Sequence, residues 1–211
     1  MYKVVAFDLD GTIAETFPVI FDSFRKIVYK YTNKLVDDKT ILATFGANEI
    51  GMLKKLIPDA PKNISDDFYK QYRESHRQLT KPFDGITKLI DWLKNNDVII
   101  PMVTGKGSIS SQISLEQLGM SDTFSPVLIG SADGPNKIDN FKKLLKQYQI
   151  TPDEMAYVAD TVGDVKACRE VEIACYSAAW SKYADAEKLK LVNENVYPSV
   201  ADLLAQFKAS Q

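Results

Sequence analysis

The sequence predicts an α/β fold, a parallel sheet covered by helices on both faces, with a helical domain inserted after the first strand. From residue 83 onward, short apolar segments alternate with amphipathic segments, as expected for a doubly wound parallel sheet. Residues 15–82 break this alternation and carry helical patterns alone. We therefore expect an α/β core formed by residues 1–14 and 83–211 and a helical cap domain formed by residues 15–82.

The predicted strands are short, almost wholly apolar and rich in Val and Ile. Strands that are buried on both faces of a parallel sheet have this composition, whereas half-exposed strands alternate apolar and polar residues. The segments that fit are 3–8, 98–103, 126–129, 155–159 and 173–177.

The predicted helices repeat apolar residues at the i, i+3, i+4, i+7 spacing that places them on one face of a helix. Two such segments lie in the core, at 84–95 and 138–148. The insertion carries four, which lie near 17–32, 37–45, 49–57 and 64–79.

The bulk composition is that of an ordinary globular protein. The 211 residues are 45% hydrophobic and 26% charged, with a formal net charge of −2. This balance gives no reason to expect a nucleic-acid or anionic-membrane surface. The longest apolar runs, such as VIIPMV, are far shorter than the roughly 20 residues of a membrane-spanning helix. Cys168 and Cys175 lack the spacing of a zinc site. We expect a reducing, cytoplasmic setting and no membrane or nucleic-acid partner.

Polar side chains gather where three of the predicted strands end. Asp8 and Asp10 end the first strand, Thr104 ends the second, and Asp160 and Asp164 follow the fourth. Because ligands of open α/β sheets bind outside the carboxyl ends of the strands, we expect these side chains to meet at one edge.

Four carboxylates at one edge repel one another, and some would become protonated in isolation. A hard divalent cation resolves this, and Mg²⁺ prefers oxygen ligands while keeping waters and phosphate oxygens in its shell. Lys137, at the start of the helix before the fourth strand, and Thr104 suit an anionic phosphoryl group. With this charge neutralised, an aspartate can attack phosphorus.

These segments resemble the four motifs of the haloacid dehalogenase superfamily. DLDGT at 8–12, Thr104, Lys137 and DTVGD at 160–164 occur in the superfamily's motif order. The resemblance covers the whole chain, including a cap between the first two motifs, and residues 82–106 resemble the cap-return region of phosphoglycolate-phosphatase-like members. It implies a Rossmann-like core with an α-helical cap and a phosphatase acting on a small phosphorylated metabolite.

The resemblance also implies a role for each catalytic residue. Asp8 would be the nucleophile that forms an aspartyl-phosphate, and Asp10 would be the general acid and base. Thr104 would hydrogen-bond the transferring phosphoryl group, with Gly105 beside it. Lys137 would orient the nucleophile and offset charge.

The metal roles follow from the same resemblance. Asp160 would coordinate Mg²⁺ together with the Asp8 side chain and the Asp10 backbone carbonyl. Asp164 would support the metal's water shell and Lys137. The dehalogenase branch lacks the acid found here at Asp10, so phosphoryl chemistry is favoured over carbon–halogen cleavage.

Three positions depart from the common motifs. VAD replaces VGD and puts Ala159 where glycine is frequent, and TGK replaces TNK or SNK, so that Gly105 lacks a side-chain amide. The usual KPxP is absent around Lys137, where GPNKIDN stands instead. Lys106 is therefore the alternative candidate for the motif lysine.

The cap offers weaker candidates for substrate contact, Gly46 and Asn48, in a turn that faces the active site in capped relatives. The substrate and the oligomeric state stay open. A phosphomutase, a phosphonate hydrolase that uses Lys34, Lys54 or Lys55 to form an imine, and a non-catalytic binding module are the alternative functions.

Overall fold

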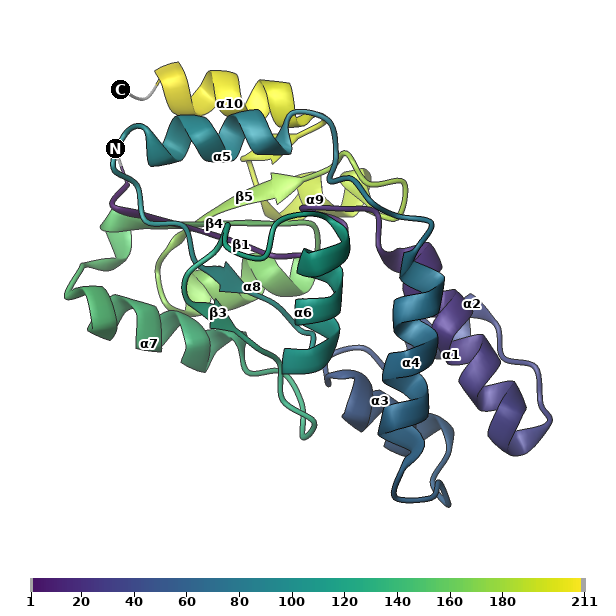
Figure 1. Ribbon diagram of the computed structural model, residues 1–211. Helices are drawn as coiled ribbons and strands as arrows, with labels where there is room; N and C mark the ends of the chain where they lie inside the picture. The colour runs from purple at the N-terminus through teal and green to yellow at the C-terminus, as the bar shows by residue number, and fades with distance from the viewer. Residues whose placement is uncertain (1, 210–211) are drawn as a thin grey trace.

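The computed structural model describes residues 2–209 and shows a parallel sheet between two layers of helices (Figure 1). Within these residues, the sheet has six parallel strands in the order β3-β2-β1-β4-β5-β6. The strands are β1 (Val4–Phe7), β2 (Met102–Val103), β3 (Val127–Leu128), β4 (Met155–Ala159), β5 (Ala174–Ala178) and β6 (Val196–Tyr197). The α/β fold class predicted from the sequence is confirmed.

The two central strands are fully buried, as their apolar sequences predict. β1 pairs with β4 from Val4 opposite Met155 to Phe7 opposite Val158. The predicted strand 155–159 matches β4, and the segments 3–8 and 173–177 contain most of β1 and β5.

The prediction for 98–103 is too long, because regular pairing in this segment is limited to Met102–Val103. Proline has no backbone N–H to donate, so Pro101 interrupts the ladder, although its carbonyl accepts a hydrogen bond from the Phe7 N–H at 3.1 Å. The strand β6 was not predicted, because a half-buried two-residue strand is too short to show a period.

Helices cover both faces of the sheet (Figure 1). On one face, α5 (Ile86–Lys94) and α10 (Val200–Ala209) pack on Val5 and Phe7. On the other, α7 (Lys137–Tyr148), α8 (Val162–Glu170) and α9 (Ala186–Val192) pack on Val4 and Ala6. Alternate residues of β1 thus serve opposite layers, and this two-sided burial explains why the strand is apolar throughout.

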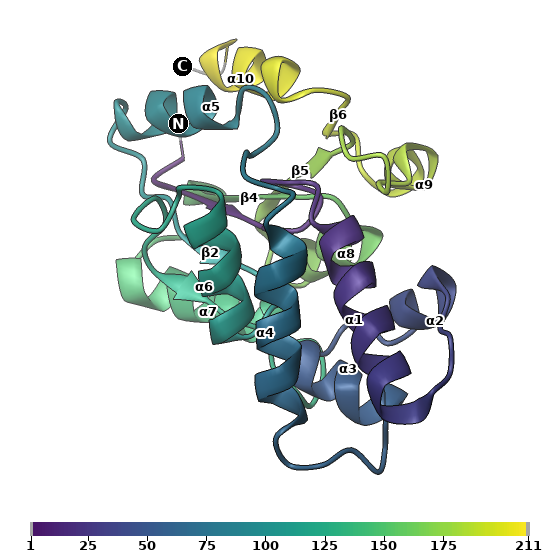
Figure 2. The same ribbon diagram turned by 45° about the vertical axis from the view of Figure 1, so that its right-hand side comes forward.

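Four of the five helices between β1 and β2 form a separate layer beside the sheet, the helical unit (Figure 2). They are α1 (Phe17–Thr32), α2 (Asp38–Leu42), α3 (Glu49–Leu56) and α4 (Ile64–His76). Their apolar faces form a cluster of their own, in which Phe24 packs on Phe68 with ring centroids 4.7 Å apart. The unit lies within the predicted cap segment 15–82. One core helix, α6 (Ser108–Gln117), contacts it through Ile113.

None of the helices in the described part of the chain is long and apolar enough to cross a membrane.

Candidate active site

The carboxyl ends of β1, β2 and β4 bring the polar residues of the predicted site together. Asp8, Thr104 and Asp160 each follow directly on their strand and are buried. The ladder continues past the strand ends, because the Asp8 N–H donates to the Val158 carbonyl at 2.9 Å and the Thr104 N–H donates to the Leu128 carbonyl at 3.0 Å. The backbone at the site is therefore held by the sheet.

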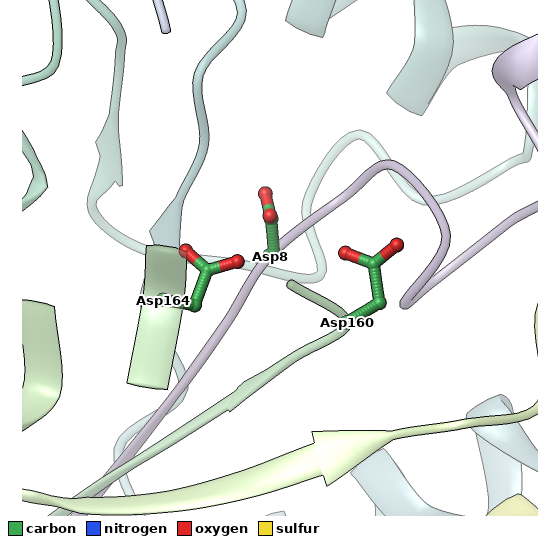
Figure 3. A group of neighbouring side chains, drawn as sticks. All are labelled: Asp8, Asp160 and Asp164. Atoms are coloured by element: carbon green, nitrogen blue, oxygen red, sulfur yellow. The ribbon is translucent and has the colours of Figure 1, made fainter. Parts of the chain in front are cut away.

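Three buried aspartates form the acidic cluster, defined here as Asp8, Asp160 and Asp164 (Figure 3). One carboxylate oxygen of each lies within 4.8 Å of those of the other two. Asp164 lies in the first turn of α8, where the Thr161 side chain caps the helix by accepting from the Asp164 N–H. This cap directs the start of α8 toward the strand ends.

Lys137, at the start of α7, bridges two members of the acidic cluster. Its Nζ lies 2.8 Å from Asp8 Oδ2 and 2.5 Å from Asp164 Oδ1. The position that the sequence assigned to the motif lysine is thus beside the predicted nucleophile. One lysine faces three carboxylates, so the cluster keeps an excess of negative charge.

The crowding changes the acidity of the cluster. Burial raises the pKa of Asp8 to about 6; Lys137 opposes this rise, and the charges of Asp164 and Asp10 add to it. Burial, followed by Asp8 and Asp164, also raises the pKa of Asp160 well above its ordinary value. For Lys137, burial alone would lower the pKa, but the neighbouring aspartates hold it well above its usual range.

The acidic cluster fits a divalent cation. Asp160 Oδ1 is buried and has no hydrogen-bond partner in the described structure, and an unpaired buried carboxylate oxygen is costly unless a cation or donor reaches it. Carboxylate oxygens are hard ligands of the kind that Mg²⁺ and Ca²⁺ prefer. A bound cation would satisfy this oxygen and lower the repulsion that raises both pKa values.

Gly11 shows why a glycine follows Asp10. Its φ of +70° lies in the left-handed region, and a Cβ added there would lie 2.2 Å from Asp160 Oδ2. A side chain at this position would collide with the acidic cluster. The Gly in DLDGT is therefore required by the backbone turn and by the close approach of Asp160.

Asp10 lies in different surroundings. Its Oδ1 accepts a hydrogen bond from the Thr16 hydroxyl and forms an ion pair with Lys106 Nζ at 3.1 Å. The Lys106 ammonium is buried and lies 4.8 Å from the centroid of the Tyr72 ring on α4. Burial would lower the pKa of Lys106, but Asp10 and Tyr72 outweigh it and raise that pKa.

The two candidate lysines therefore occupy different positions, Lys137 beside Asp8 and Lys106 beside Asp10. The sequence offers Lys106 as the alternative to Lys137 for the motif lysine, whereas the structure gives each lysine its own position and its own aspartate partner. The pairing of Lys106 with Asp10 was missed, because nothing in the TGK segment indicates which acid its lysine meets.

A cavity of about 700 Å³ opens beside these groups. Gly105 lines it together with Asp8, Asp10, Lys137 and the two downstream aspartates. The Thr104 hydroxyl accepts from the Lys106 N–H at 3.2 Å, so Thr104 braces the loop that carries Gly105. Of the predicted catalytic, phosphate-binding and metal-binding residues, all except the fully buried Thr104 line this one cavity.

The two weaker candidates of the helical unit lie differently. Gly46 lines the cavity. The Asn48 side chain caps α3 by accepting from Ile50 N–H at 3.1 Å, and its amide donates to the Gly130 carbonyl at 3.2 Å. Asn48 therefore connects the helical unit to a core loop. Both its side-chain oxygen and its side-chain nitrogen are already hydrogen-bonded within the protein.

Glu49 is a further contact that sequence reasoning missed. This buried carboxylate accepts from the Gly107 N–H at 2.8 Å and from the Tyr69 hydroxyl at 3.0 Å. It thereby caps α6, the helix that follows the loop of Thr104 and Gly105. In the sequence, Glu49 reads only as an acid in the first turn of α3, because its core partner is 58 residues away.

Comparison with known proteins gives consistent matches. The family model of haloacid dehalogenase-like hydrolases matches residues 5–178. A phosphoglycolate phosphatase of Chromobacterium violaceum is 28% identical over 199 residues, which is 89% of each chain, and one of Xylella fastidiosa is 21% identical, covering 84% of this chain and 80% of its own.

The crystal structure of a predicted phosphoglycolate phosphatase from Haemophilus somnus superposes with a TM-score of 0.80 at 17% identity. The match covers 100% of this chain and 98% of that one. At this identity the likeness shows the fold.

Proposed function

Because the chain belongs to the haloacid dehalogenase-like hydrolases, we propose that it is a Mg²⁺-dependent phosphatase that acts through an aspartyl-phosphate on Asp8. Its family and its phosphoglycolate phosphatase relatives identify it as a hydrolase of phosphoric monoesters. The proposed substrate is a small phosphorylated metabolite of the phosphoglycolate kind. The observation that carries the proposal is the acidic cluster, three carboxylates within 4.8 Å with one lysine between them.

In this proposal Mg²⁺ is held by the side chains of Asp8 and Asp160 and the backbone carbonyl of Asp10, with Asp164 supporting its water shell. The donor set consists of oxygens alone, which suits a hard divalent cation such as Mg²⁺. When bound, Mg²⁺ neutralises charge on the phosphoryl oxygens and on the acidic cluster.

The first step is in-line attack of an Asp8 carboxylate oxygen on phosphorus, with cleavage of the bond between phosphorus and the ester oxygen. The carboxylate is oriented at both oxygens, because Oδ1 accepts from the Leu9 N–H at 2.8 Å and Oδ2 meets Lys137. Thr104, Gly105 and Lys137 bind the transferring phosphoryl group. Asp10 donates a proton to the departing alkoxide.

In the second step, water attacks the phosphorus of the aspartyl-phosphate and Asp10 accepts its proton. Inorganic phosphate leaves, and the Asp8 carboxylate is restored. Thr16 and Lys106 fix the Asp10 side chain at the cavity wall. The helical unit, which lines the same cavity through Gly46, acts as a cap that limits bulk water during the first transfer.

The phosphonate-hydrolase alternative receives less support from the cavity. Among the described residues, the lysines that line it are Lys137 and Lys166, whereas an imine-forming phosphonate hydrolase would need Lys34, Lys54 or Lys55 there. Lys55 Nζ instead donates to the Thr44 carbonyl at 3.3 Å. A phosphomutase would return the phosphoryl group to a substrate hydroxyl rather than to water.

A panel of phosphorylated metabolites, assayed for inorganic phosphate with Mg²⁺ and with a chelator, tests the proposal. We expect Mg²⁺-dependent phosphate release from at least one ester and its loss in Asp8→Asn. Sugar-phosphate isomers in place of phosphate would identify a phosphomutase. Failure of the wild-type protein to release phosphate from every ester would overturn the proposal.

A further inference from the structure

The outer part of the catalytic cavity is walled by aromatic rings. We call Phe17, Phe45 and Tyr183 the aromatic wall. The Phe17 ring stacks on Phe45 with centroids 6.2 Å apart and an interplanar angle of 8°, and its centroid lies 4.9 Å from that of Tyr183. All three residues line the cavity that contains Asp8 and Asp10.

Two of these rings remain open to solvent. Phe45 is 37% exposed and Tyr183 is 38% exposed, and the neighbouring Leu42 is 41% exposed. Single exposed apolar side chains are ordinary, but a contiguous apolar surface inside a concave site marks a ligand contact. The exposed faces here belong to the cavity that holds the predicted nucleophile.

The wall is built from both parts of the molecule. Phe17 begins α1 and Phe45 lies between α2 and α3, whereas Tyr183 lies in the core loop between β5 and α9. Phe17 also reaches the catalytic loop, since one of its ring carbons lies 3.0 Å from the position that a Cβ on Gly11 would occupy. The aromatic surface therefore continues from the acidic cluster outward.

The charges along the cavity disfavour an anionic leaving group. The acids lining it number six and the lysines two; Asp10 is already paired with Lys106, which is not among the lining residues, and one of the lining lysines, Lys137, is paired with Asp8 and Asp164. The other, Lys166, shares the outer rim with Glu170 and Asp185. Once a phosphoryl group occupies the inner end, the outer part is acidic and apolar.

The size of the cavity points the same way. A volume of about 700 Å³ lies within the range of pockets that enclose drug-sized ligands, roughly 300–1,000 Å³. A two-carbon leaving group such as glycolate would fill a small part of it and would leave the aromatic wall in contact with water.

We propose that the substrate is a phosphomonoester whose uncharged leaving group carries a planar aromatic ring, which packs on the aromatic wall. This inference rests on the proposed phosphatase function, but it replaces the phosphoglycolate-like substrate suggested by the relatives with an aromatic phosphomonoester. The ring lies against Phe45 and Tyr183 while the phosphoryl group meets Asp8. Offset or edge-to-face packing of aromatic rings supplies the recognition.

Benzyl phosphate, ethyl phosphate and 2-phosphoglycolate test this substrate class, because all three release a primary alcohol and differ in the group it carries. We expect kcat/KM for benzyl phosphate to exceed that for each of the others by about tenfold or more, the size of one aromatic stacking contact. Phe45→Ala and Tyr183→Ala should each reduce the ratio of benzyl to ethyl phosphate kcat/KM several-fold.

Tyr29→Ala is the matched control, because Tyr29 is an exposed aromatic residue of α1 outside the cavity lining. In this variant, the ratio of benzyl to ethyl phosphate kcat/KM should equal that of the wild type. Thermal unfolding establishes that each variant is folded. Preference for 2-phosphoglycolate, or an unchanged ratio in both wall variants, would overturn the inference while leaving the phosphatase intact. Absence of Mg²⁺-dependent phosphate release from all three esters and from the metabolite panel would overturn the proposed function and this inference with it.

Discussion

Asp8 and Asp10 are two residues apart, yet their carboxylates lie in contrasting surroundings. Asp8 belongs to a cluster of three acids that share one lysine. Asp10 is paired with a lysine of its own and with a threonine hydroxyl. The acidic cluster around Asp8 carries more negative charge than Lys137 neutralises. The Asp10 carboxylate, in contrast, already has partners within the protein. The two surroundings thus suit the different tasks proposed for these identical side chains, cation binding with nucleophilic attack for Asp8 and proton transfer for Asp10.

The largest effect is expected from removing the nucleophile. Asp8→Asn keeps the size of the side chain but removes the attacking oxygen anion, so kcat/KM should fall at least about a thousandfold. Phosphate release from the best ester of the panel measures this. Near wild-type turnover in Asp8→Asn would place the nucleophile elsewhere.

Lys106→Met separates the two aspartate environments. Loss of the ion pair at 3.1 Å frees the Asp10 side chain but keeps it, so kcat should fall about 10–100-fold, less than the roughly 100–10,000-fold that a general acid–base group itself contributes. The Mg²⁺ concentration for half-maximal activity should stay unchanged, because Lys106 pairs with Asp10 and not with the acidic cluster.

Lys137→Met is the complementary variant, and it should shift the Mg²⁺ dependence, because Lys137 contacts Asp8 and Asp164 directly. If the Mg²⁺ dependence moves in Lys106→Met and stays constant in Lys137→Met, the division between the two environments is wrong.

The acidic cluster should also make the stability of the metal-free protein depend on pH. Burial raises the pKa of Asp8 from 3.8 to about 6, so the folded protein binds a proton that the unfolded chain has released. This contribution to stability is complete below pH 4 and is lost as the pH rises through about 6. The raised pKa of Asp160 acts in the same direction.

In urea unfolding with a chelator, Asp8 should therefore contribute about 2 kcal/mol more to the free energy of unfolding at pH 4.5 than at pH 7.5. The difference should shrink in Asp8→Asn. An equal pH dependence of the free energy of unfolding in the wild type and in Asp8→Asn would contradict the assignment to the acidic cluster.

A smaller effect, about 1 kcal/mol, is expected from Asp160→Asn in the absence of metal. Removing one of three crowded negative charges should raise the free energy of unfolding at pH 7, since Asp160 Oδ1 lacks a partner in the described structure. Saturating Mg²⁺ should reverse the order and favour the wild type. A variant less stable than the wild type without metal would show that Asp160 is held by contacts other than a cation.

The sequence predicted the acidic cluster because each member follows an apolar strand or begins the next helix. Asp8 and Asp160 come directly after β1 and β4, and neighbouring parallel strands end at one edge. The predicted strand 98–103 was too long, because hydrophobicity alone does not show that Pro101 lacks a backbone N–H to donate.

Contacts between the helical unit and the core could not be predicted. Lys106 meets Tyr72 of α4, and Glu49 of α3 caps α6 at Gly107. These pairs depend on how two separately packed layers meet, which local periodicity does not encode. The aromatic wall is of the same kind, since it joins Phe17 and Phe45 to Tyr183.

The most direct test of the account is calorimetric titration of Mg²⁺ into the metal-free protein and into Asp160→Asn and Lys106→Met. We predict saturable binding at one site in the wild type, loss of that binding in Asp160→Asn and its retention in Lys106→Met. Absence of binding to the wild type, or equal binding to Asp160→Asn, would contradict the claim that the acidic cluster holds the cation.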